Sequence, residues 1–167
     1  DRRRSKKEED HALRPDRSFE MRERSVRVSA GSEDTRTYLQ SMYRDDDGRI
    51  WCQLCQRSLD DASFAKRDGT HFFEAVELFP DGHLAKESAE PSVLLCTLCA
   101  AKYRELVKKQ TRNAQFDTIK DRILGLDLAN AEEEDLRIPL ELNGSEGNLR
   151  FVGKHFLDLQ AILNMEQ

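Results

Sequence analysis

The chain has 167 residues, of which 38% are hydrophobic and 35% are charged, with a formal net charge of -5 and a mean hydropathy of -0.75. No segment approaches the roughly 18 consecutive apolar residues of a membrane-spanning helix, and the charged N-terminus lacks the apolar stretch of a signal peptide. These features predict a cytoplasmic protein with no membrane partner and one domain plus appendages. The chain begins at Asp1 rather than Met, which suggests a piece of a longer protein or a processed product.

Residues 1–31 are predicted to be a charged linker or arm. The first thirty residues contain ten Lys/Arg and seven Asp/Glu, whereas the remainder contains seventeen and twenty-five. The arm holds a basic cluster of the kind that neutralises phosphates, consisting of Arg2, Arg3, Arg4, Lys6 and Lys7. Nucleic acid is therefore one candidate partner, although a solvated linker is the simpler interpretation of such a charge run.

The remaining residues, 32–167, are predicted to form a single α+β domain. A helix is expected to begin at Ser32 as its N-cap and to end at the turn-forming "DDDG", Asp45 to Gly48. Its apolar residues recur at helical spacing and are Tyr38, Leu39, Met42 and Tyr43.

A helix, a hairpin and a second helix are predicted over residues 113–165. One helical face stops at Gly125 and consists of Phe116, Ile119, Ile123 and Leu124. An acidic loop, "AEEEDL", follows, and alternating apolar residues after it predict a hairpin. The turn of this hairpin, "NGSEGN", is expected to be a longer loop. Its two strands contain Ile138, Leu140 and Leu142, and Leu149 to Val152. The last helix is amphipathic and uses Phe156, Leu159, Ile162 and Leu163.

All four cysteines fall into two pairs with the same spacing, Cys52-Gln-Leu-Cys55 and Cys96-Thr-Leu-Cys99. A two-residue gap lets both thiolates of a pair face one ion, and four sulfur ligands in a tetrahedron are typical of a closed structural zinc site. Disulfides or a redox Cys-x-x-Cys are the alternatives. The matched spacing in a cytoplasmic chain favours one shared zinc ion as the cofactor, bound by Cys52, Cys55, Cys96 and Cys99.

The segment between the pairs contains a strand of its own, "FFEAVELFP", and the second pair is followed by a helix former, "AAKYRELVKK". The predicted zinc core, residues 51–108, is therefore a knuckle, a β-hairpin, a second knuckle and a helix. This order makes a small treble-clef zinc module, flanked by helices and by the C-terminal hairpin.

The zinc core resembles the HNH endonucleases that have a four-cysteine zinc site. The resemblance depends on "WCQLC", "FFEAVELFP" and "PSVLLCTLCAAKYREL". It implies a strand with two adjacent histidines, an Asn shortly before the third cysteine and a His after the fourth, which together hold a catalytic cation and activate water.

This chain departs from the family pattern at each of those positions. Val76 and Glu77 stand where the strand histidines belong, the Asn position falls near Ser92, and Ala100 and Ala101 follow the fourth cysteine. Phosphodiester hydrolysis needs a cation and a base poised near neutral pH. We therefore predict that the chain is not an enzyme and has no catalytic residues.

A looser resemblance extends beyond the zinc core and implies a module over residues 34–163. The order of "RSVRVSAGSEDTRTYLQSMY", the zinc module and "LRFVGKHFLDLQAIL" is similar to the C-terminal ends of large bacterial proteins with a sacsin-type ATPase region. It implies a terminal recognition or docking module whose partner is another protein or the rest of a longer polypeptide.

Three hypotheses follow: a non-catalytic zinc-binding interaction or targeting module, a DNA-binding module, and a divergent metal-dependent nuclease. The third would need a second cation at Glu77, with help from His71, Glu74, His83 or Glu87.

Overall fold

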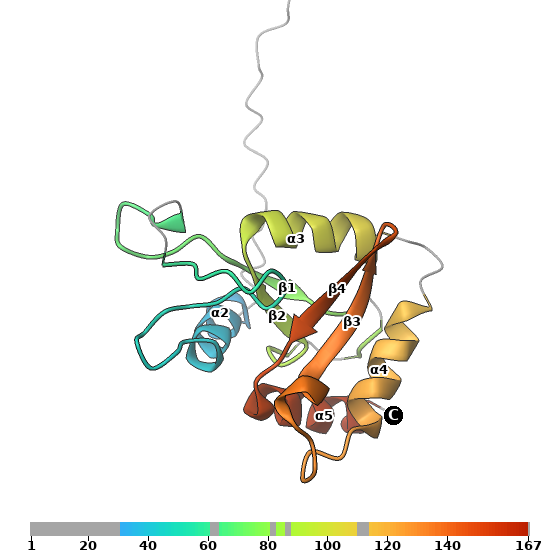
Figure 1. The fold of residues 1–167 in the computed structure, drawn as a ribbon. Helices are drawn as coiled ribbons and strands as arrows, with labels where there is room; N and C mark the ends of the chain where they lie inside the picture. The colour runs from blue at the N-terminus through green and yellow to red at the C-terminus, as the bar shows by residue number, and fades with distance from the viewer. Residues whose placement is uncertain (1–30, 61–63, 81–82, 86–87, 110–113, 167) are drawn as a thin grey trace, which may run out of the picture.

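Two short antiparallel β-hairpins with helices around them make up the described part of the chain (Figure 1). The structure is a computed structural model that describes residues 31–60, 64–80, 83–85, 88–109 and 114–166. The α-helices among these residues are α2 (Gly31–Met42), α3 (Thr97–Tyr103), α4 (Gln115–Gly125) and α5 (Gly153–Met165). The predicted α+β class is confirmed, and the basic cluster predicted in the arm lies outside the described residues.

The first hairpin delivers the second cysteine pair to the start of a helix. Strands β1 (Glu74–Glu77) and β2 (Ser92–Leu95) pair antiparallel, with Val76 opposite Val93. All four residues of β2 are buried, and the chain passes from β2 through Cys96 directly into α3. The helix continues as a π-helical segment, η2 (Arg104–Lys108), and the buried Tyr103 hydroxyl donates to the Leu78 carbonyl oxygen at 2.5 Å. The predicted helix after the second pair is therefore confirmed.

The C-terminal hairpin follows a single 3-10 turn, η3 (Glu133–Leu136), and consists of β3 (Arg137–Leu142) and β4 (Ser145–Arg150). Its turn has two residues, Asn143 and Gly144, with φ angles of 51° and 82°. The predicted longer loop is therefore wrong. Asn and Gly both tolerate positive φ, which a type I′ turn requires, so the chain reverses at once and the residues from Ser145 onward join the strand.

The remaining predicted helices are present, with small shifts at their ends. Helix α2 begins at Gly31, one residue before the predicted cap. Of the predicted apolar face of α4, Phe116, Ile119 and Ile123 are buried and Leu124 is partly buried. In α5 the buried apolar residues are Phe156, Leu159 and Leu163. Gln160 joins the two C-terminal helices, because its side-chain amide donates to the carbonyl oxygens of Ile123 and Leu126, at 2.7 Å in each case. None of the described helices combines the length and apolar character that crossing a bilayer requires.

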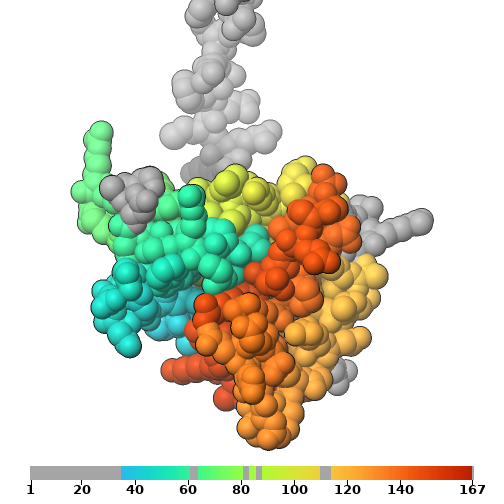
Figure 2. All heavy atoms as spheres, in the orientation of Figure 1, coloured from blue at the N-terminus to red at the C-terminus, as the bar shows by residue number. Residues whose placement is uncertain are grey.

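One hydrophobic core joins the cysteine region to the C-terminal hairpin and helix. Its fully buried members come from both parts, for example Leu94 of β2, Tyr103 of α3 and Phe156 of α5. The backbone makes the same connection, since the Arg150 N–H donates to the Gln53 carbonyl oxygen at 2.9 Å. Figure 2 shows the segment around the first cysteine pair lying against the C-terminal hairpin. The cysteine region is thus packed into the rest of the described structure.

Candidate metal centre

The first cysteine pair lies in a tight turn closed by its own backbone. The Cys52 N–H donates to the Arg57 carbonyl oxygen, and the Gln56 N–H donates to the Cys52 carbonyl oxygen, both at 3.0 Å. Gln56 adopts a left-handed conformation with φ of 61°, and its side-chain amide donates to the Gln53 carbonyl oxygen at 2.7 Å. These contacts curl the chain so that the two thiols of the pair can face one point.

The second pair lies where β2 meets α3. Cys96 is the N-cap of α3, and its sulfur accepts the Cys99 N–H at 3.4 Å. The Cys96 N–H in turn donates to the Cys52 sulfur at 3.3 Å, which ties the two pairs together. A helix N-terminus also places its free N–H groups and positive dipole end beside the sulfurs, which favours thiolates there.

The structure brings all four predicted ligands together. Their sulfur atoms all lie within 4.8 Å of one another, and those of Cys55 and Cys96 are 4.0 Å apart. A tetrahedral zinc site with Zn–S bonds of about 2.3 Å needs sulfurs about 3.8 Å apart, so a metal ion fits with little movement. Cys52, Cys96 and Cys99 are buried and Cys55 is exposed, so the site meets solvent on one side.

The crowded thiols favour a cation. The Cys99 thiol and nearby backbone N–H groups lower the pKa of Cys52 to about 5. Burial, together with the charge at Cys52, raises the pKa of Cys55 to about 11, and the hydrogen bond to Cys52 holds the pKa of Cys99 well above its usual value. One thiolate therefore opposes the ionisation of its neighbours, and a divalent cation supplies the charge that allows all of them to ionise.

Gln53, between the cysteines of the first pair, connects the site to both hairpins. Only 2% of its surface is exposed. Its side-chain oxygen accepts the Leu94 N–H at 2.7 Å, while its amide nitrogen donates to the Tyr43 hydroxyl at 2.8 Å and to the Arg150 carbonyl oxygen at 3.1 Å. The sequence contains no motif that predicts this role, because each partner is distant along the chain or on another element.

A buried hydrogen-bond chain continues from Gln53 into α5. The Tyr43 hydroxyl and His155 Nδ1 are 2.6 Å apart, and His155 Nε2 is 2.7 Å from the Glu90 carbonyl oxygen. The carbonyl can only accept, so Nε2 must hold the proton and Nδ1 accepts from Tyr43. Burial also lowers the pKa of His155. The imidazole is thus a neutral structural link between Tyr43 and Glu90.

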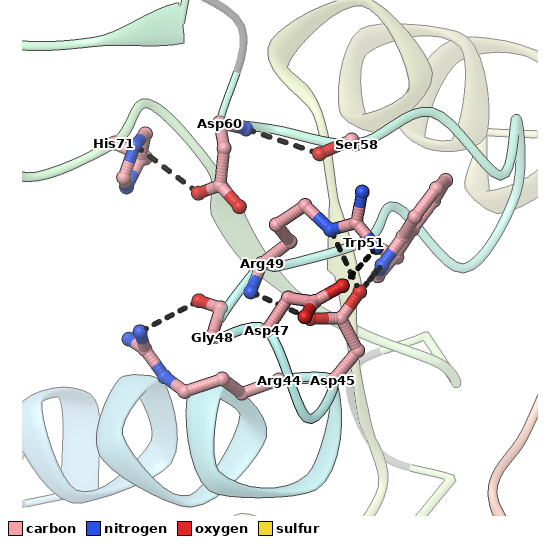
Figure 3. Close-up of polar contacts among 9 residues, drawn as sticks. All are labelled: Arg44, Asp45, Asp47, Gly48, Arg49, Trp51, Ser58, Asp60 and His71. Atoms are coloured by element: carbon pink, nitrogen blue, oxygen red, sulfur yellow. Dashed lines mark hydrogen bonds and ion pairs between the residues drawn. The ribbon is translucent and has the colours of Figure 1, made fainter.

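The other residues weighed for a second cation site lie apart from the cysteines. His71 Nε2 is 3.2 Å from the Asp60 carboxylate (Figure 3), and His83 stacks on Phe79 with ring centroids 6.4 Å apart. Glu74 pairs with Arg104. Within the described ranges, the four cysteines are the sole cluster of three or more groups positioned to hold one ion.

Of the remaining candidates for a second cation site, Glu77 is exposed, and Glu87 lies outside the described residues.

Comparisons of the chain with protein-family models, curated proteins and solved structures found no match.

Replacing Gln53 by Leu should destabilise the protein strongly. The substitution removes three side-chain hydrogen bonds and leaves buried backbone groups of β2 and β4 without partners, at a cost of about 1–3 kcal/mol for each unsatisfied group. We expect a loss of about 3 kcal/mol in the free energy of unfolding, measured by urea denaturation of the metal-loaded protein. Gln56→Leu in the same turn is the control, because that side chain is exposed and makes one bond; equal losses in the two variants would contradict the role of Gln53.

The buried imidazole should make the protein less stable in mild acid. The folded pKa of His155 lies below its usual 6.5, so the unfolded chain takes up a proton that the folded chain refuses. The contribution of the neutral His155 to the free energy of unfolding is fully present above pH 6.5. It is lost as the pH falls below 6.5, by up to about 1.4 kcal/mol per pH unit.

The measurement compares the pH dependence of unfolding for the wild type and His155→Gln between pH 7.5 and 5, so that shared titrations of the thiols, Glu90 and Asp158 cancel. The wild-type slope should be steeper below pH 6.5. Parallel curves would contradict a neutral His155.

Proposed function

We propose that this chain is a non-catalytic zinc-binding interaction or targeting module of a larger intracellular protein, with a frame similar to that of the four-cysteine HNH endonucleases. The metal is zinc, because four soft sulfur ligands near tetrahedral spacing suit it better than they suit magnesium, calcium or manganese. The order of the first cysteine turn, the β1–β2 hairpin, the second cysteine turn and α3 supports a treble-clef module.

The observation that carries the proposal is the burial of Val76 and Ala100. These residues occupy two positions where the resemblance would require histidines, and they are 2% and 0% exposed. Val76 lies opposite Val93 in the hairpin, and both belong to the hydrophobic core. The corresponding side chains therefore stabilise the fold, where a nuclease would direct ligands towards a cation.

The two carboxylates of β1 have separate surroundings. Glu74 pairs with Arg104, which already neutralises its charge, whereas Glu77 lies exposed at the other end of the strand. Side chains three positions apart in a strand point to opposite faces. This separation supports a surface role for Glu77, since a shared cation site would need the carboxylates to converge.

Zinc should be required for folding of the central region. Metal analysis of the purified protein should find one zinc ion per chain, and chelation should lower the melting temperature sharply, because structural zinc sites contribute about 10 kcal/mol or more to folding. Cys96→Ser should bind little zinc and lose its cooperative unfolding transition, whereas Ser58→Ala, outside the ligand set, should keep both. Four freely reactive thiols in a folded, metal-free protein would contradict the structural site.

The functional proposal is tested by placing the three hypotheses in one experiment. The zinc-loaded chain is incubated with plasmid in magnesium or manganese, and with labelled duplex at low salt, and is used as bait for crosslinking in cells. We expect no cleavage and no duplex shift, together with crosslinks to a defined protein that are absent for Cys96→Ser.

Cleavage that is abolished by Glu77→Gln, with zinc content and stability unchanged, would overturn the proposal in favour of a divergent nuclease. A salt-sensitive duplex shift would instead support the DNA-binding module.

A further inference from the structure

A cavity of about 470 Å³ lies beside the first cysteine pair. It is bordered by the end of α2, the turn after it and the junction between β4 and α5. Met42, Trp51 and Val152 contribute to its apolar lining, and Arg44 and Arg150 are also among the residues that line it. Its volume lies in the range typical of ligand sites, and an apolar wall with few polar groups is the usual lining of such sites.

The cavity borders the edge of a small β-ladder. The Asp45 N–H donates to the Arg49 carbonyl oxygen at 2.9 Å, and the Trp51 N–H donates to the Tyr43 carbonyl oxygen at 3.3 Å. Arg44 and Ile50 therefore face each other as a non-hydrogen-bonded pair. In such a pair the N–H and carbonyl of Arg44 point away from Ile50, towards the outside of the ladder.

The Arg44 edge is open to a further strand. On the opposite side of the ladder, the Ile50 carbonyl oxygen accepts the Leu59 N–H at 2.7 Å, so Ile50 has a backbone neighbour on each side. Among the described residues, no backbone hydrogen bond to the peptide groups of Arg44 is present. Four consecutive residues, 42–45, line the cavity. The cavity therefore adjoins the segment that carries the open edge at Arg44.

The charges around the cavity select an acidic ligand. Asp45 is already neutralised, because its carboxylate accepts from Trp51 Nε1 at 2.9 Å and pairs with Arg49 (Figure 3). Arg150 pairs with Glu133. Arg44 donates to the Gly48 carbonyl oxygen at 2.8 Å, but within the described part of the chain no carboxylate pairs with it. Of the charged residues that line the cavity, Arg44 is therefore the one without a partner of opposite charge among the described residues.

We propose that this edge and cavity bind an extended peptide in which an acidic residue adjoins an apolar one. The peptide backbone adds a strand at Arg44, the apolar side chain enters the cavity against Trp51 and Val152, and the carboxylate pairs with the Arg44 guanidinium. This is β-strand addition, in which the main chain supplies affinity and the pocket supplies specificity. The inference rests on the proposed function, since it names the kind of partner that the interaction module takes.

Trp51 is the single tryptophan of the chain, so its fluorescence reports directly on the cavity. The zinc-loaded chain is titrated with three pools of blocked hexapeptides that lack tryptophan and tyrosine. One pool has a central Leu, Ile or Met flanked by Glu or Asp; the second has the same centre flanked by Lys; the third keeps the acidic flanks around Ser. We expect saturable change in Trp51 emission with the first pool alone, and NMR shifts at the Arg44 amide.

Two arginine variants separate the cavity from general charge. Arg44→Ala should weaken binding of the acidic-apolar pool about tenfold or more, as expected when a charge-assisted pair is lost. Arg57→Ala is the matched control, because Arg57 is exposed beside the first cysteine pair but does not line the cavity. The affinity of this variant for the acidic-apolar pool should equal that of the wild type. Zinc content and melting temperature confirm that both variants are folded.

Several results would overturn the proposal: no response to any pool, equal responses to the acidic and basic pools, or unchanged affinity in Arg44→Ala. Emission that changes with protein concentration alone, together with dimers in sedimentation, would assign the edge to a second copy. Displacement of the peptide by an oligonucleotide would assign it to nucleic acid.

The proposed function is judged separately by its crosslinked partner. A partner bound equally by the wild type and Arg44→Ala leaves the interaction module standing and overturns this site. Glu77-dependent cleavage would overturn the function while leaving peptide binding measurable.

Discussion

The convergence of four sulfur atoms from two distant cysteine pairs is the constraint on which the rest of the structure depends. Forty residues separate Cys55 from Cys96, yet all four sulfurs lie within 4.8 Å of one another. The strands between them are only four residues long, and a two-stranded hairpin of that size is marginal in water. A divalent cation at this cluster would relieve the repulsion between thiolates and hold the short hairpin to the helix that follows it.

Gln53 extends this constraint to the C-terminal half. A buried amide is costly unless its donors and acceptor all have partners, and those of Gln53 are supplied by β2, by the end of β4 and by Tyr43 after α2. The same network reaches α5 through the neutral His155. The elements outside the cysteine region therefore complete its hydrogen bonding, which explains why the described structure has one continuous core.

The two surfaces around this centre differ in what they offer a partner. At the β1–β2 hairpin, Val76 is committed to the core and Glu74 is neutralised by Arg104. Beside the first cysteine pair there is a cavity with apolar lining, and among the described residues the backbone edge at Arg44 and its side-chain charge have no partner strand or carboxylate. A recognition site beside the cysteines would suit a metal ion that only stabilises the fold, since a closed sulfur shell has no position for substrate.

The sequence by itself determined the cysteine cluster, the helices and the C-terminal hairpin, because these depend on local spacing: two-residue gaps between thiols, helical periodicity and alternation in strands. It also contains the Asn143–Gly144 pair, whose tolerance of positive φ sets a two-residue turn in place of the predicted longer loop. Only the tertiary structure decided the partners of Gln53, the neutral state of His155 and the cavity beside Trp51. Those features join residues up to 112 positions apart, and contacts at such separations are set by how the elements pack, which no local pattern encodes.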